Sequence, residues 1–287
     1  MRRTVLTFLA LAASSGANAE WFYDAEAGLT YDDNVNRAEA SRDIEEDTIF
    51  SLGLSAGRAF PLENAQTLVV MSHLKLARHT EISDLGSIRP GITLRYLNKL
   101  GLGPLAPRIS LGGSIEYISS RDDLRDSWRY QASFGYSKRL SELWDINANA
   151  SYSIRRMQDV PGGLPFATDV FDQNNFSLSL GTGYAVSENW LINFGYRFDK
   201  GDVDSVATAP NPPFVRASSA RILDPSFGPS KVVYKLDADT HSFLIDASRA
   251  LNEQTSVNIG YERIMTDAVD NIEYDSNIFR INLLYTF

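Results

Sequence analysis

The sequence predicts an all-β fold, a single closed antiparallel transmembrane β-barrel of about twelve strands. Three observations lead to this prediction. Apolar and polar residues alternate with a period of two in twelve segments, short and long connections follow one another between these segments, and aromatic residues gather at the segment ends. A soluble β-sandwich shows the same alternation, so the connections and the aromatic residues decide between the two folds.

An apolar residue at every second position defines each of the twelve segments. In chain order, their apolar faces span residues 21–31, 50–56, 68–76, 92–96, 109–117, 128–136, 144–154, 176–186, 190–198, 243–247, 257–261 and 279–287. The intervening residues are polar or small, as with Asp145, Asn147 and Asn149 in the seventh segment. We therefore expect twelve strands with one face toward lipid and the other toward the barrel interior.

The connections alternate in length along the chain. Short ones at residues 141–143, 187–189 and 252–254 alternate with long ones at 32–47, 79–87, 119–127, 156–174, 199–239 and 266–274. Strands of roughly 9–11 residues, short periplasmic turns and long extracellular loops are typical of outer-membrane barrels. The barrel must be closed, because an open edge would leave unpaired backbone groups in hydrocarbon.

Aromatic residues are expected at both membrane–water interfaces. Trp21, Trp144, Trp190, Tyr285 and Phe287 fall at the rim with the short turns, and Tyr31, Tyr117, Trp128, Tyr152 and Phe198 fall at the opposite rim. Two such girdles match the two interfaces of a bilayer.

The first nineteen residues have the pattern of a secretory signal peptide. Arg2 and Arg3 precede an apolar core at 5–13, and Ala17 and Ala19 form a small-x-small cleavage site. We expect a signal peptide over 1–19, cleavage near Ala19 and a barrel domain over 20–287. The sequence has no cysteine, which excludes a lipid-modified cysteine anchor and disulfides.

Charge and motif content exclude several classes of function. Without Arg2 and Arg3, 25 basic residues stand against 36 acidic ones, a net charge of −11, which argues against nucleic-acid binding. No nucleotide-binding or zinc-hydrolase motif occurs, and no cofactor is expected. The histidines are His73, His79 and His241. His241 and Ser242 are sequence neighbours, so on a strand they point to opposite faces and cannot form a catalytic pair. The sequence predicts no enzyme and no catalytic residue.

The segment after the first strand has oxygen-bearing side chains at calcium-loop spacing. Asp32, Asn34 and Asn36 alternate, but Arg37 takes the glycine position and Asp43 the bidentate glutamate position. We therefore expect solvated loop residues and no metal site. The acidic rim of this and the last long loop would share divalent cations with lipopolysaccharide or favour cations at the mouth.

Charged residues on the polar faces are the candidate site. By strand parity the inward-facing acids are Asp24, Glu26, Glu116, Asp145, Asp246 and Glu262, and the inward-facing bases are Lys75, Arg95, Arg129, Arg155, Arg197 and Arg280. Such lumen-lining rows fit either a water-filled pore with a transverse field or a closed, salt-bridged interior. The fifth long connection, 199–239, holds five of the eleven prolines and is expected to fold over or into the mouth.

The last strand supports a resemblance to a known class. The signal peptide, the strand pattern and the terminal alternation of Leu283, Tyr285 and Phe287 resemble the porin-like outer-membrane β-barrel proteins of Gram-negative bacteria. The resemblance implies location in the cell outer membrane, contact with its lipid and lipopolysaccharide, and an assembly signal in these three residues that the barrel-assembly machinery reads.

The end of the first strand adds a narrower resemblance. Residues 31–37 are similar to a motif in outer-membrane barrels associated with exopolysaccharide export, and to one in surface-lipoprotein assembly modifiers, whose helical repeat domain this sequence lacks. From the barrel and its inward-facing charges we expect a passive or gated channel for small polar or saccharide solutes, and the resemblance implies a tie to polysaccharide export. The alternative is a non-conducting scaffold or adhesion barrel that acts through its extracellular loops.

Overall fold

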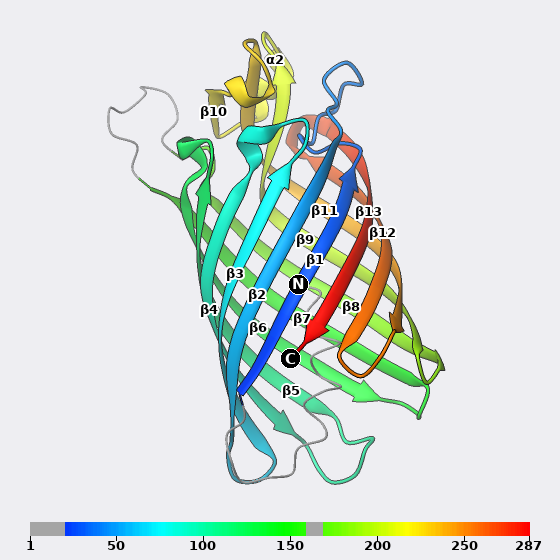
Figure 1. Ribbon diagram of the computed structural model, residues 1–287. Coiled ribbons are helices and arrows are strands. Elements are labelled where there is room, and N and C mark those ends of the chain that lie inside the picture. Colours follow the sequence, from blue (N-terminus) through cyan, green and yellow to red (C-terminus); the bar gives the residue numbers. More distant parts are fainter. Residues whose placement is uncertain (1–20, 159–168) are drawn as a thin grey trace.

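Twelve long strands form one closed barrel in the computed structural model, which describes residues 21–158 and 169–287 (Figure 1). The strands are β1 (Trp21–Asp32), β2 (Asp47–Pro61), β3 (Gln66–His79), β4 (Ser87–Lys99), β5 (Arg108–Ser120), β6 (Ser127–Arg139), β7 (Trp144–Met157), β8 (Gln173–Ser187), β9 (Trp190–Thr208), β11 (Lys231–Ala250), β12 (Thr255–Ala268) and β13 (Ile272–Thr286). The prediction of a twelve-stranded barrel is confirmed. The predicted signal peptide and part of the fourth long loop lie outside the described residues.

Every barrel strand pairs antiparallel with a strand on each side. Sequence neighbours pair along the whole chain, β9 pairs with β11, and β1 closes the ring on β13, where Asp24 lies opposite Thr286. Closure satisfies the backbone N–H and C=O groups of both edges, which water cannot do inside a membrane. The pairing of β4 with β5 skips Arg89 and Pro90, because proline has no N–H to donate, and the register of β8–β9 shifts between Ala185 and Ser187.

The two faces of the barrel wall differ in exposure, as the alternation predicts. Apolar side chains such as Phe50, Ile92 and Phe134 are exposed, while most of the polar residues between such positions are buried or half-buried. Aromatic pairs lie near the two rims, with Tyr117 and Trp128 at 5.0 Å between ring centroids and Trp144 and Tyr184 at 4.6 Å. These pairs lie at the ends of the strands where the girdles are expected.

The strands are longer than expected, and the fifth long loop differs most from the prediction. Barrel strands contain 12 to 20 residues, with β9 at 19 and β11 at 20. β9 and β11 remain paired out to Thr208 and Lys231, so the expected loop 199–239 is mainly a continued hairpin. We name residues 202–237 the hairpin. Its residues alternate poorly because both faces are covered, and that is why the sequence pattern missed these strand ends.

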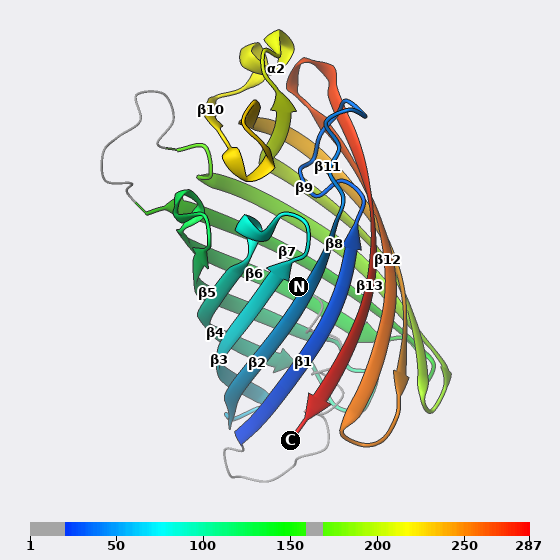
Figure 2. The ribbon, with the colours of Figure 1, turned by 45° about the horizontal axis from the view of Figure 1, so that its top comes forward.

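Short elements complete the outer end of the barrel (Figure 2). The hairpin carries α2 (Pro212–Ala217), the four-residue strand β10 (Ala220–Leu223), which pairs with β11, and the 3₁₀ turn η3 (Pro225–Phe227). Further 3₁₀ turns are η1 (Ser83–Leu85), η2 (Asp123–Arg125) and η4 (Val269–Asn271). None of the described helices is long and apolar enough to cross a membrane.

The final strand places its alternate residues on the exposed face. Leu283 and Phe287 are exposed, the rings of Tyr285 and Phe287 meet edge to face at 4.7 Å, and the backbone N–H of Phe287 donates to the Tyr23 carbonyl. The role of these three residues as an assembly signal stays a prediction.

Gly201 marks the point where the hairpin leaves the barrel. It pairs with Asn175 at the last position of β8–β9 pairing and with Ala238 on β11, where β12 also ends. Its φ is +141°, and an added Cβ would lie 2.1 Å from the Asn174 carbonyl oxygen. We expect Gly201→Ala to destabilise the barrel by roughly 2 kcal/mol or more, measured as the urea midpoint in detergent.

Gly113→Ala is the matched control, because an added Cβ there meets its nearest atom only at 4.0 Å. The control should unfold with the wild-type midpoint. Equal midpoints for the two variants would contradict the constraint assigned to Gly201.

Candidate functional site

A buried carboxylate organises the basic side of the inner face. Glu116 accepts from Lys75 Nζ at 2.9 Å, lies 3.1 Å from His73 Nε2, and lies 3.8 Å from Arg129 Nη1. Its side chain is only 7% exposed, whereas those of Lys75 and Arg129 are 44% and 38% exposed. The two cations therefore remain accessible from the interior, while the carboxylate is covered.

Like charges lie directly opposite each other around this carboxylate. Lys75 faces Arg89 across β3–β4, and Arg129 faces Arg155 across β6–β7. Like-charged cross-strand neighbours repel. Two further cations thus lie beside the two that pair with Glu116, and this part of the barrel wall has more cations than acids.

A second carboxylate, on the other side of the barrel, is fully neutralised. Glu262 accepts from Arg197 Nη2 at 3.0 Å and forms an ion pair with Arg280, and its side chain is 1% exposed. Arg197 also donates to Asp199 at 2.7 Å. Buried charges need such partners because desolvation is costly. This cluster ties β9, β12 and β13 together.

The other predicted site residues lie at separate positions. Asp246 accepts from the side-chain amides of Asn193 and Asn258, and Asp24 accepts from Thr286 Oγ1. Glu26 lies on β1, opposite Leu284 of β13 and Gly53 of β2. Within the described residues, Arg95 on β4 and Asp145 on β7 form no ion pair, while Arg155 donates to Ser127 Oγ at 2.8 Å. All twelve alternate with the exposed apolar positions, and their role in lining a solute path stays a prediction.

Sequence reasoning missed Arg89. The structure places it opposite Lys75, on the same face as Arg95. The fourth apolar face was expected to start at Ile92, because Pro90 was not read as a strand residue. Ile88, Pro90 and Ile92 share one parity and are all exposed, and this pattern was the signal that would have found Arg89.

The segment at 31–37 is held closed by an ion pair, and we name it the clasp. The Arg37 side chain takes the place that a metal ion has in a calcium loop. The Arg37 guanidinium donates to both carboxylate oxygens of Asp32, at 2.9 and 2.7 Å, to the Asn34 carbonyl and to Ser276 Oγ. Arg37 has φ +55°, the left-handed conformation that glycine adopts in a calcium loop. No group of three or more metal-ligating side chains occurs in residues 21–158 and 169–287.

The three histidines occupy unrelated places. His73 contacts Glu116 inside the barrel, His79 lies 3.0 Å from Asp47 at the outer rim, and His241 lies 2.8 Å from the Tyr196 hydroxyl. None of these contacts joins a histidine to a serine or a threonine nucleophile.

The hairpin contacts the rim on the far side of the barrel. Its 3₁₀ turn η3 lies against η1, which connects β3 to β4. Four strands separate β11 from β3 in one direction (β12, β13, β1 and β2), and four separate β9 from β4 in the other (β8, β7, β6 and β5). The hairpin therefore reaches the opposite side of the rim.

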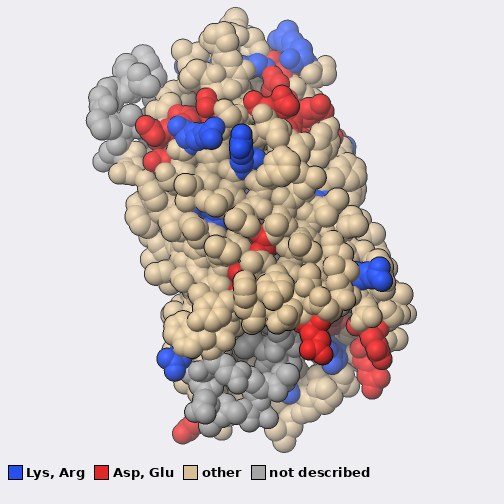
Figure 3. Space-filling model, viewed as in Figure 1, with Lys and Arg blue, Asp and Glu red and all other residues tan. Residues whose placement is uncertain are grey.

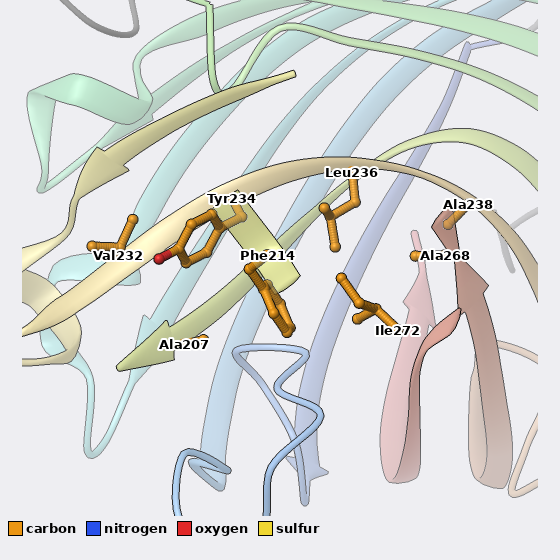
Figure 4. Close-up of a cluster of buried hydrophobic side chains, with 8 residues drawn as sticks. All are labelled: Ala207, Phe214, Val232, Tyr234, Leu236, Ala238, Ala268 and Ile272. Atoms are coloured by element: carbon orange, nitrogen blue, oxygen red, sulfur yellow. The ribbon is translucent and has the colours of Figure 1, made fainter. Parts of the chain in front are cut away.

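Two apolar clusters fix the hairpin to the loops. The first consists of Ala207, Phe214, Val232, Tyr234, Leu236 and Ala238 of the hairpin and its base with Ala268 and Ile272 at the β12–β13 connection (Figure 4). The second joins Val206, Ala220 and Val233 to Val170 and Phe171 of the fourth loop. Phe214 and Tyr234 meet edge to face at 5.3 Å. Burial of this apolar surface holds the hairpin down.

Polar contacts fix the hairpin to the first and third loops. Lys231 Nζ donates to Asp43 Oδ1 at 3.1 Å, and both side chains are buried. Thr208 donates to the same carboxylate, and the Val206 N–H donates to the Asn36 carbonyl at 3.0 Å. Asp224 of the hairpin pairs with Arg125 of the third loop. Ionised carboxylates therefore help to hold the hairpin against the first and third loops.

The ionisation of Asp43 is stabilised by these contacts. Burial disfavours the charged form, but hydrogen bonds from Thr208 and Lys231 outweigh burial and hold the pKa of Asp43 below its ordinary value. A pKa that is lower in the folded state stabilises the docked hairpin fully above about pH 4, and this contribution is lost as the pH falls through the folded value.

Acidification should release the hairpin from the first loop. A spin label on Ser219→Cys, in a chain with no other cysteine, should become more mobile below about pH 4. Asp43→Asn should raise its mobility at pH 7, because Lys231 is left as a buried cation without its main partner. The measurement is the electron paramagnetic resonance line shape.

The control is Glu39→Gln, an exposed acid in the same loop. Its label should behave as in the wild type. An unchanged line shape in Asp43→Asn at pH 7 would exclude the assigned role of Asp43.

Comparisons with known proteins agree on the fold. No protein-family model matches the sequence, and no curated protein does. The structure is similar to that of the COG4313 outer membrane channel from Pseudomonas putida F1, with a TM-score of 0.59 and 13% identity over 96% of this chain and 97% of that one. The KdgM porin gives a TM-score of 0.48 with 11% identity over 92% of this chain and 99% of that one. The NanC porin gives 0.46 with 10% identity over 92% and 98%. The chain thus has the closed twelve-stranded fold of outer-membrane β-barrel channels.

Proposed function

We propose that this protein is a gated outer-membrane channel for small anionic polar solutes, with acidic saccharides as the class that its inner face fits best. The observation that carries the proposal is the excess of positive charge around Glu116. Lys75 and Arg129 pair with Glu116, and each lies opposite a second cation, Arg89 or Arg155. An anionic solute passing this wall would relieve the repulsion between the paired cations.

The polar side chains beside this cluster suit a hydroxylated solute. Inner positions of β6 and β7 bring Gln131 opposite Ser153, Ser133 opposite Ser151, and Ser137 opposite Asn147. Within the described residues, the buried Oδ1 atom of Asn149 has no hydrogen-bond partner. Hydroxyl and amide groups in such a row exchange hydrogen bonds with sugar hydroxyls.

The hairpin supplies the gate. Its Asp204 carboxylate approaches Arg155 Nη1 at 3.9 Å, so the hairpin offers an acid of its own to the basic wall. An anionic solute would compete with Asp204 for Arg155. Solute entry and hairpin release are therefore coupled in this proposal.

Polysaccharide export and the non-conducting scaffold are each supported by a single observation. A role in polysaccharide export is supported by the resemblance of residues 31–37 alone, and the structure gives this segment a structural task as a clasp. The non-conducting scaffold is favoured by one observation, the apolar packing of the hairpin over the mouth. Conductance separates the scaffold from the gated channel.

Removal of the hairpin tip should open the channel. Deleting residues 209–230 and joining Thr208 to Lys231 through a short turn leaves β9 and β11 paired but removes Phe214 and Asp224. We expect a larger single-channel conductance than the wild type in a planar bilayer, because the contacts across the mouth are lost. Loop shortening itself changes closure entropy little.

A single substitution should act in the same direction. Phe214→Ala leaves a cavity in the first cluster, at a cost of about 3 kcal/mol or more, and should raise the open probability. Val215→Ala, at an exposed neighbouring position, is the control and should gate as the wild type does. Silence of the deletion variant, once shown to be folded, would reject the channel in favour of the scaffold.

Neutralising the basic wall should change ion selectivity. Arg95→Gln with Arg129→Gln lowers the positive potential inside a narrow tube, where salt screens weakly. In a potassium chloride gradient, the reversal potential should show a permeability ratio of chloride to potassium reduced by roughly twofold or more. Asp24→Asn, which removes an acid of β1, should shift the ratio the other way. The same direction of shift in both variants would refute the proposed field.

A further inference from the structure

A groove lies on the exposed face of the barrel near its outer rim. Its volume is about 440 Å³. Leu52, Leu76, Ile88 and Ser119 stand opposite one another in sequence across β2, β3, β4 and β5, and they form a row along its apolar wall. Ser119 is the small member of this row, so the surface is hollowed there.

Two arginines border the groove on its outer side. Arg78 lies opposite Phe50 near the end of β3, and Arg121 follows β5 directly, with its Cδ atom beside Gly86. Both side chains are exposed. Basic and acidic side chains gather at this end of the face over β2–β4 (Figure 3).

These two arginines differ from the other outward-facing cations at the outer ends of the strands. Arg156 pairs with Asp172, Lys200 with Asp239, and Arg263 with Asp275. Among the described residues, neither Arg78 nor Arg121 forms an ion pair or a side-chain hydrogen bond. Nearby acids such as Asp84 and Asp123 belong to η1 and η2, beyond the strand ends.

We infer that this groove binds a lipid of the outer leaflet that carries phosphate on its headgroup. The arginines lie at the level where headgroups meet the barrel, and guanidinium binds phosphate through paired hydrogen bonds. The apolar row lies directly beneath them, on the membrane side, and accommodates an acyl chain. The position of the cations above an apolar trough matches a phosphorylated lipid and not free phosphate. This site is independent of solute passage.

Binding of diphosphoryl lipid A to the folded, detergent-solubilised barrel tests this inference by native mass spectrometry. The test variant is Arg78→Gln with Arg121→Gln, and the matched control is Arg156→Gln with Arg263→Gln, which removes two cations that already have carboxylate partners. A third variant, Ser119→Phe, fills the groove and keeps both arginines. The heat-modifiable mobility of each variant on a gel first establishes that it is folded.

The wild type should hold lipid A about tenfold or more tightly than the test variant, because charge-assisted hydrogen bonds are lost. The control should bind as the wild type does, and Ser119→Phe should bind more weakly. Equal affinity of the wild type and the test variant would overturn the inference. An equal loss in the control would do so as well, since binding would then follow net charge alone. Displacement of lipid A by millimolar inorganic phosphate would rule out the acyl-chain part.

Discussion

Backbone hydrogen bonding is the constraint on which the rest of this structure depends. Each strand of the ring has a partner on both sides, because no unpaired N–H or C=O group is tolerated in hydrocarbon. β9 and β11 extend out of that ring beyond Gly201 and Ala238, because their pairing with the flanking strands β8 and β12 ends there. There the edge of β11 is covered by β10, and Val206 on β9 donates to the first loop. The hairpin lies across the mouth because that is where its free edges find partners.

The charged residues of the interior are also divided between the ring and the hairpin. One side of the inner face is neutral, since Glu262 and Asp199 together balance Arg197 and Arg280. The other side has more cations than acids around Glu116, and the hairpin brings Asp204 to it. Buried ion pairs contribute little net stability but are costly to break singly, so they specify position. In this barrel they specify where the hairpin docks, while the apolar clusters supply most of the energy.

The strands were predictable from the sequence because one face of each meets lipid, which imposes a strict period of two. The hairpin was not predictable, because both of its faces are covered. Consecutive residues such as Val232, Val233 and Tyr234 are all buried, so apolar and polar residues do not alternate there. Arg89 was missed because the neighbouring Pro90 is untypical of a strand. The partners of Glu262 come from other strands, and only the closed ring defines the register of these strands. The position of the Arg37 guanidinium, where a calcium loop has a metal ion, depends on Ser276, 239 residues away.

We propose that the hairpin closes a hydrated channel and can leave its mouth. Single-channel recording on Asp43→Cys with Thr208→Cys, joined by a short reducible thiol cross-linker, tests it most directly, since these two side chains hydrogen-bond across the loop–hairpin contact. We expect silence while the cross-link is intact and openings after reduction in the same bilayer. Equal conductance before and after reduction, or silence in both states, would contradict it.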